Sequence, residues 1–300
     1  MNNIIKPLND HKHSIYSQHG EDGIIEEIIN RIDVNRLDKW CVELGAWDGI
    51  VDSNTYNLIK NKGYKGVLIE GNKTKYNQLC KNMPSNEVIK ICKFVNFEGE
   101  NSLEQVLIQT PIPKTFDFIS IDIDGCDYFI FEHLVYYRPK IVCVEFNTEI
   151  PNEVNFIQQK NFDIKQGCSP KSIIDLSRKK NYSLAAGTFS NLIFVDQQYK
   201  ETVIGKKEVN LEDIRNDHDV KNYIFSTYDG TIFTSKSTNL HWHKINITHN
   251  KLQILPKIFR QLRNDYSLLK RLLFYIYREF KFPGRILKKI FKGKKKNEFL

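Results

Sequence analysis

Short apolar runs alternate with segments of helical periodicity along the first two thirds of the chain. The apolar runs, typical of buried parallel strands, fall at 40–42, 65–70, 88–95, 116–121 and 139–146. Segments with apolar residues three and four apart fall at 24–32, 53–62, 73–82, 102–109, 128–136 and 169–181. Two further runs, 182–186 and 191–195, are joined by a short loop and predict an antiparallel hairpin. The pattern predicts an α/β fold whose sheet is mostly parallel with one antiparallel strand.

The pattern changes beyond residue 200. Segments 223–228 and 231–233 flank Asp229-Gly230 and predict a β-hairpin. His241 and His243, two apart, could bind a metal from one face of a strand, but no third ligand is evident. From residue 251 onward the spacing is helical.

We therefore expect three regions in the chain. They are a main domain at 1–198, a β-hairpin addition near an acceptor pocket at 199–250, and a basic amphipathic helical tail at 251–300.

Composition is that of an ordinary globular protein, with 41% hydrophobic and 27% charged residues. No apolar run is long enough to span a membrane, and no secretory signal opens the chain, so a cytoplasmic location is expected. The six cysteines form no C-x-x-C pair. We expect reduced thiols and no zinc site.

The charge is unevenly distributed. Residues 251–300 contain 15 Lys/Arg and 3 Asp/Glu, whereas the whole chain carries only +8, so residues 1–250 are at −4. Residues 251–300 are therefore expected to contact an anionic membrane surface peripherally. Within them, the basic segment 285–296 (RILKKIFKGKKK) predicts an amphipathic helix that could lie on such a surface. Packing of its apolar face on the body or on the second subunit of a homodimer is the alternative. No aromatic stacking platform accompanies it, so nucleic acid is not expected.

The segment 40–49, WCVELGAWDG, has the strongest chemical signal. An apolar strand leads into a turn through Glu43 with glycines at 45 and 49, which lets the backbone bend tightly and approach a ligand. An acid at the strand end suits a ligand with hydroxyls and a cation, such as S-adenosylmethionine, better than a pyrophosphate. The alternative is a glycine turn of the kind found in many α/β sheets.

Polar residues also follow the later strands. Glu70 ends the second strand, where an acid can accept hydrogen bonds from ribose hydroxyls. Asn96 follows the third and could meet an adenine edge or simply occupy a turn. Gln18 and Glu21, just before the first predicted helix, either line the ligand pocket or belong to the helix start. His133, alone on its predicted helix, is expected to be structural.

Asp122 and Asp124 follow the fourth strand at its carboxyl end, where open α/β sheets bind ligands. If the first and fourth strands are neighbours, both acids face the same crevice as Gly45. They could coordinate a metal, orient a methyl donor or take a proton from an acceptor; a helix cap with a turn is the alternative. Glu145 lies at or near the end of the fifth strand.

Together these segments resemble the FkbM-like S-adenosylmethionine-dependent methyltransferases. The matching pieces lie in order over 16–196: SQHGEDG, CVELGAWDG, GVLIEGN, DFISIDIDGCD, PKIVCVEFN and NYSLAAGTFSNLIFV. The resemblance implies a class I methyltransferase, Rossmann-like sheet and transfer of a methyl group, usually to a hydroxyl oxygen. The family often has Asp-x-Glu-Gly after its fourth strand, whereas 122–125 is Asp-Ile-Asp-Gly, one methylene shorter at the second acid.

Residue by residue, the resemblance implies that Glu43, Gly45 and Gly49 form the cofactor turn and that Glu70 holds the ribose. The full set expected to bind S-adenosylmethionine is Gln18, Glu21, Glu43, Leu44, Gly45, Ala46, Gly49, Glu70, Asn72, Asn96 and Asp122. The expected catalytic residues are Asp122, Asp124 and Glu145, and no resident metal is expected.

The expected function is O-methylation of a sugar or glycan-type hydroxyl, with Asp122 or Asp124 orienting the hydroxyl or taking its proton. Two alternatives stay open. One is a nucleotide-sugar glycosyltransferase that uses a divalent metal on Asp122-x-Asp124. The other is a membrane-surface scaffold with the same fold and no activity.

Overall fold

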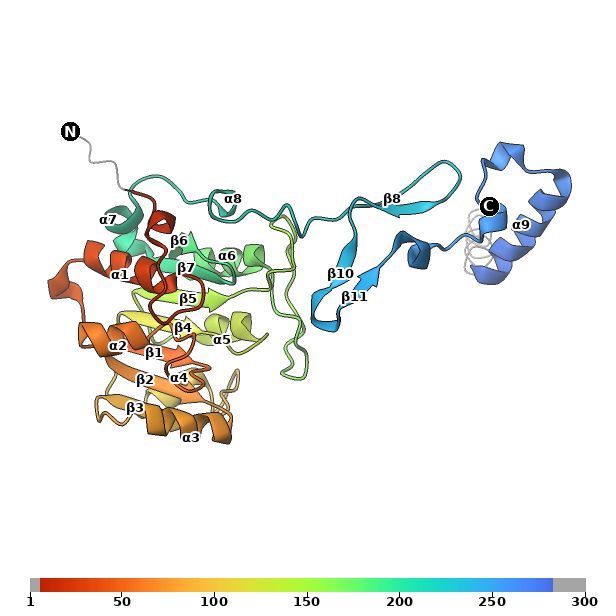
Figure 1. Cartoon of the computed structure of the whole chain (residues 1–300). Coiled ribbons are helices and arrows are strands. Elements are labelled where there is room, and N and C mark those ends of the chain that lie inside the picture. The colour runs from red at the N-terminus through yellow and green to blue at the C-terminus, as the bar shows by residue number, and fades with distance from the viewer. Residues whose placement is uncertain (1–5, 283–300) are drawn as a thin grey trace, which may run out of the picture. The chain divides into compact units, whose positions relative to one another are not determined.

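The computed structural model describes residues 6–282, in which the chain forms two compact units that meet in sequence at Val220 and Lys221 (Figure 1). The first unit therefore includes the segment 199–220. The basic helix expected at 285–296 lies outside the described residues.

A seven-stranded sheet forms the centre of the first unit (Figure 1). Its strands are β1 (Trp40–Leu44), β2 (Lys65–Glu70), β3 (Val88–Cys92), β4 (Phe118–Ile121), β5 (Ile141–Glu145), β6 (Tyr182–Gly187) and β7 (Asn191–Asp196). They lie in the order β3-β2-β1-β4-β5-β7-β6, with β7 antiparallel to both of its neighbours and the other pairs parallel. This is the class I methyltransferase, Rossmann-like sheet that was expected.

Helices cover both faces of this sheet. They are α1 (Glu21–Arg31), α2 (Tyr56–Lys62), α3 (Lys73–Asn82), α4 (Leu103–Leu107), α5 (Asp127–His133), α6 (Pro170–Lys179), α7 (Lys200–Ile204) and α8 (Leu211–Ile214), with 3-10 turns at Leu8–His11, Val34–Arg36 and Gln197–Tyr199. Successive strand residues point to opposite faces. Cys41 accordingly joins the apolar cluster of α1, α2 and α7, whereas Val42 joins that of α4, α5 and α6.

The direction in which strands are added reverses between β1 and β4. The chain places β2 and β3 on one side of β1, then returns to place β4 on the other side. In an open α/β sheet, the carboxyl ends of two such strands border the crevice where ligands bind. The sheet therefore brings the turn after β1 and the acidic loop after β4 to one edge.

The second unit contains two small hairpins and one long helix. These are β8 (Ile224–Ser226) with β9 (Ile232–Thr234), β10 (Thr238–Leu240) with β11 (Ile245–Ile247), and α9 (Leu268–Lys281), with 3-10 turns at His241–His243, His249–Leu252, Lys257–Phe259 and Arg263–Asp265. The hairpin predicted around Asp229-Gly230 is confirmed. Whether it covers an acceptor pocket stays a prediction.

The sequence left open that His241 and His243 lie on one strand, but both residues lie in the 3-10 turn that joins β10 to β11. The continuous helical region predicted from residue 251 is wrong at its start. Residues 251–267 form 3-10 turns rather than continuous α-helix. Pro256 has no backbone N–H and immediately precedes one of these turns. It therefore interrupts the α-helix that the spacing of the leucines around it predicts.

Candidate active site

Gly45 and Asp122 lie in backbone contact at the carboxyl edge of the sheet. Leu44 is paired with Ile121, and the Asp122 N–H donates to the Leu44 carbonyl at 3.2 Å. Gly45 has a φ of 83°, and a Cβ built on it would lie 1.8 Å from the Asp122 carbonyl oxygen. Only glycine fits there. The structure thus brings the glycine turn and the fourth-strand acids together.

Glu43, near the end of β1, is hydrogen-bonded to the segment that precedes α2. Its buried carboxylate accepts hydrogen bonds from the Ser53 hydroxyl at 2.6 Å, the Thr55 hydroxyl at 2.7 Å and the Asn54 N–H at 2.7 Å. Burial raises the pKa of Glu43 to about 7, against the opposing effect of these three hydrogen bonds. This acid fixes the segment before α2, which explains why that helix begins at Tyr56 rather than at residue 53.

Glu70, the last residue of β2, is hydrogen-bonded to the turn that follows β1. Its carboxylate accepts hydrogen bonds from the Trp47 N–H at 2.9 Å and the Asn72 N–H at 2.6 Å. Each carboxylate oxygen keeps a lone pair for a further donor. The Asn72 side-chain oxygen accepts from the N–H groups of Thr74 and Lys75, so it caps the start of α3.

The rest of the turn is held by backbone contacts. Gly45 and Ala46 both donate to the Ile69 carbonyl, at 3.0 and 3.1 Å, and Leu44 and Ala46 are buried. A Cβ on Gly49 would lie 2.5 Å from a methyl carbon of Leu79 in α3. The second glycine therefore lets α3 pack closely on the turn.

Three carboxylates converge beyond Gly45: Asp122, Asp127 and Glu145. Each offers an oxygen, and these oxygens lie within 4.8 Å of one another. Asp127, the first residue of α5, also accepts hydrogen bonds from the N–H groups of Ile123 at 2.7 Å and Gly125 at 2.9 Å, and so holds the acidic loop. Asp124, in contrast, is exposed, with a φ of 59°.

Burial and mutual repulsion raise the pKa of all three clustered acids. Burial is the main cause for each, and the next cause is the charge of Asp124 for Asp122 and that of Asp122 for Asp127 and Glu145. The pKa of Asp122 rises to about 6. Such a cluster is stabilised near neutral pH if some of its carboxyl groups stay protonated, or if a cation lies against them.

The N-terminal residues expected at the ligand have different surroundings. Gln18 is exposed, whereas Glu21 is fully buried and accepts hydrogen bonds from the His19 N–H at 2.8 Å and the Asn191 side-chain amide at 3.0 Å, and from the Thr188 hydroxyl. Glu21 thereby ties the start of α1 to the β6–β7 turn. Asn96, also exposed, forms an isolated β-bridge with Ser102.

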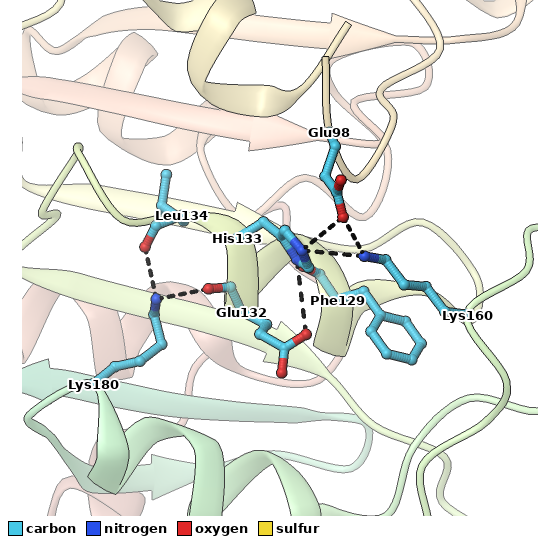
Figure 2. A network of polar contacts seen from close by, with 7 residues as sticks. All are labelled: Glu98, Phe129, Glu132, His133, Leu134, Lys160 and Lys180. Carbon is cyan, nitrogen blue, oxygen red and sulfur yellow. Dashed lines mark hydrogen bonds and ion pairs between the residues drawn. The ribbon is translucent and has the colours of Figure 1, made fainter.

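His133 lies in a polar network at the end of α5 (Figure 2). Its Nδ1 lies 2.8 Å from the Phe129 carbonyl, which makes Nδ1 the donor, and Nε2 lies 3.1 Å from the Lys160 ammonium. The Lys160 ammonium also pairs with Glu98 at 2.7 Å. These contacts join α5 to two surface loops and match the structural role predicted for His133.

A pocket of about 450 Å³ opens beside the β6–β7 turn. Thr188 lines the pocket, and its N–H donates to the carbonyl of Asn191, the residue that is paired with Glu145 in the sheet. Its lining combines basic, aromatic and polar side chains, which include Lys12, His19, Thr188, Phe189 and Arg215.

Sequence reasoning missed several residues of this edge. Asp127 stands where a helix-capping acid is ordinary, and the segment 53–55 reads as the first turn of a helix. Only the pairing of strands shows that Asp127 meets Glu145 and that Ser53 meets Glu43. The trio joins Asp122 and Glu145, both expected in the catalytic set, with Asp127, which was not expected, and Asp124 lies outside it.

Solved structures of methyltransferases share this fold at low similarity. A structure described as a SAM-dependent methyltransferase from Aquifex aeolicus is 10% identical, with 57% of this chain and 87% of that chain covered and a TM-score of 0.34. The METTL16 methyltransferase domain is 14% identical, with 58% of this chain and 64% of that chain covered and a TM-score of 0.37. Monomeric WbdD is 13% identical, with 66% of this chain and 46% of that chain covered and a TM-score of 0.40. Similarity this low carries no argument about activity.

No family model and no curated protein matches the chain. The FkbM-like resemblance therefore rests on the six sequence segments alone.

Proposed function

We propose that the first unit is an S-adenosylmethionine-dependent methyltransferase. The contact between Gly45 and Asp122 is the observation that carries this proposal. It places a turn whose residue 45 admits no Cβ beside the acidic loop after β4, at the point of a doubly wound sheet where ligands bind. S-adenosylmethionine fits such an edge because its ammonium and sulfonium groups are cations and its ribose supplies hydroxyl donors.

Each side chain then has a definite task. The backbone of 45–49 borders the ligand, Glu70 accepts from the ribose hydroxyls, and Asp122 faces the cationic part. Glu43 and Asp127 act as positioning residues, because their hydrogen bonds hold the two loops in place. Gln18 and Asn96, both exposed, are assigned to the cofactor from their positions in the chain alone, before α1 and after β3. The bound cofactor supplies an activated methyl group.

The acceptor we assign is a hydroxyl of a saccharide. The pocket beside the β6–β7 turn contains the exposed ring of Phe189, which could pack on the apolar face of a sugar, and it is lined by basic and hydroxyl groups that could hold the polar edge. Asp122, with a pKa of about 6, is suited to accept the hydroxyl proton near neutral pH, and Asp124 is the alternative base. The FkbM-like resemblance adds support for oxygen as the methylated atom.

The competing function is metal-dependent sugar transfer from a nucleotide-sugar. The trio of Asp122, Asp127 and Glu145 favours it, since three oxygens within 4.8 Å could be ligands of one divalent ion. This reading differs from the predicted Asp122-x-Asp124 motif, because Asp124 lies outside the trio.

Calorimetric titration separates the two functions. The full-length protein should bind S-adenosylmethionine without added metal, and Glu70→Gln should weaken that binding by about tenfold, the loss of one charged hydrogen bond. Glu87→Gln is the control, because Glu87 is an exposed acid outside the turn. Absence of binding by the wild type, or Mn²⁺-dependent binding of a UDP-sugar instead, would overturn the proposal.

A further inference from the structure

Helix α9 turns its apolar side chains outward. Six of them are between 46% and 88% exposed: Leu268, Leu269, Leu272, Leu273, Ile276 and Phe280. Their spacing of three and four residues places them along one side of the helix, over a length of about 20 Å. No residue of α9 is buried. A stripe of large apolar groups left in water indicates a surface that binds a partner.

The opposite side of α9 is fixed within the second unit by aromatic contacts. The ring of Phe274 lies 5.5 Å from that of Phe259 and 5.6 Å from that of Tyr266, between centroids. The Tyr277 hydroxyl donates to the Ile254 carbonyl at 2.9 Å. The helix is therefore anchored by its aromatic side, and this anchoring leaves the leucine-rich side facing outward.

The charge around this stripe is positive. Residues 251–282 contain eight Lys/Arg and two Asp/Glu. Arg271 and Lys281 are exposed on α9 itself, and the acid Glu279 is paired with Arg278. A second copy of the chain would bring two such basic regions together, whereas an anionic surface would neutralise them.

We propose that α9 binds the surface of an anionic lipid membrane. The six apolar side chains enter the boundary between headgroups and acyl chains, and the surrounding Lys and Arg side chains contact the anionic headgroups. No helix within residues 6–282 is long and apolar enough to cross a membrane, so α9 lies along the surface. The proposal is independent of the catalytic function. It narrows the membrane contact expected for residues 251–300 to the apolar side of α9.

Flotation of the full-length protein with vesicles tests the proposal. The wild type should bind phosphatidylcholine vesicles that contain phosphatidylglycerol and bind pure phosphatidylcholine more weakly. The double variant Leu272→Glu/Ile276→Glu should lose about tenfold or more in vesicle partitioning. The control Val34→Glu/Ile108→Glu makes the same change in charge at two exposed apolar positions of the first unit and should keep wild-type binding.

The variant Leu272→Ala/Ile276→Ala keeps the charge and should lose part of the binding, which serves as the test if the glutamate variant does not fold. Equal vesicle binding by the α9 variants and the control would overturn the proposal. So would a wild-type dimer in lipid-free solution that becomes a monomer in the α9 variants, since a second copy would then cover the stripe.

Discussion

The carboxylate of Glu43 accepts a hydrogen bond from the Ser53 hydroxyl at 2.6 Å, which joins the end of β1 to the segment before α2. Glu43 is buried, and the pKa of its carboxyl rises from the usual 4.5 to about 7 in the folded chain. The folded state thus binds the proton more tightly than the unfolded state does. Its contribution to stability is complete below pH 4.5 and is lost as the pH rises toward 7.

Glu43→Gln should remove this pH dependence. Between pH 4.5 and 7, the free energy of unfolding of the wild type should fall relative to that of the variant by about 3 kcal/mol at most. Urea unfolding of both proteins across this range measures the difference. A constant difference at all pH values would show that folding does not raise the pKa of Glu43.

Asp127 should act through the acidic loop. Asp127→Ala removes the acceptor for the Ile123 and Gly125 N–H groups. We expect the free energy of unfolding to fall by about 2 kcal/mol and the rate of methyl transfer to be affected more strongly than stability. Glu132→Ala, at an exposed acid of the same helix, is the control. Chemical denaturation and turnover with labelled S-adenosylmethionine check both effects. Wild-type turnover in Asp127→Ala would contradict a positioning role.

Gly45 and Gly63 form a matched pair for a test of the turn. Both have positive φ values, 83° and 69°, but a Cβ on Gly63 meets nothing within 4 Å, whereas one on Gly45 meets the Asp122 carbonyl oxygen at 1.8 Å. Gly63→Ala should cost only the backbone strain, about 1–2 kcal/mol. Gly45→Ala should cost several kcal/mol more or prevent folding. Thermal melting compares them, and similar melting temperatures would show that the two strand ends separate easily.

Asp122 should make cofactor binding depend on pH. Its pKa of about 6 means that it gains its charge between pH 5 and 7, and the charged form attracts a cationic ligand. The affinity for S-adenosylmethionine should therefore rise over this range by about tenfold, which corresponds to about 1.4 kcal/mol. Asp122→Asn should abolish the rise. If the affinity of Asp122→Asn had the same pH profile as that of the wild type, the positive charge of the ligand would not lie at Asp122.

The fold could be predicted from the sequence because local patterns determine it. Buried strands such as β1 and β4 are short, mainly apolar runs, and the β6–β7 turn is short enough to force an antiparallel pair. The site was predicted less completely. That Gly45 and Asp122 meet depends on the strand order, which the sequence left as a condition. The partners of Glu43, Glu70 and Asp127 are set by loop geometry that no periodicity shows. The outward leucines of α9 follow a pattern that ordinarily marks a core-facing side, so only the structure reveals their exposure.

Hydrogen-exchange mass spectrometry with and without S-adenosylmethionine tests the central claim most directly. Ligand in the proposed edge should slow exchange of backbone amides in 44–50, 70–72 and 122–127, and leave those of α9 unchanged. Protection confined to segments away from the Gly45 turn and the Asp122 loop would contradict the account.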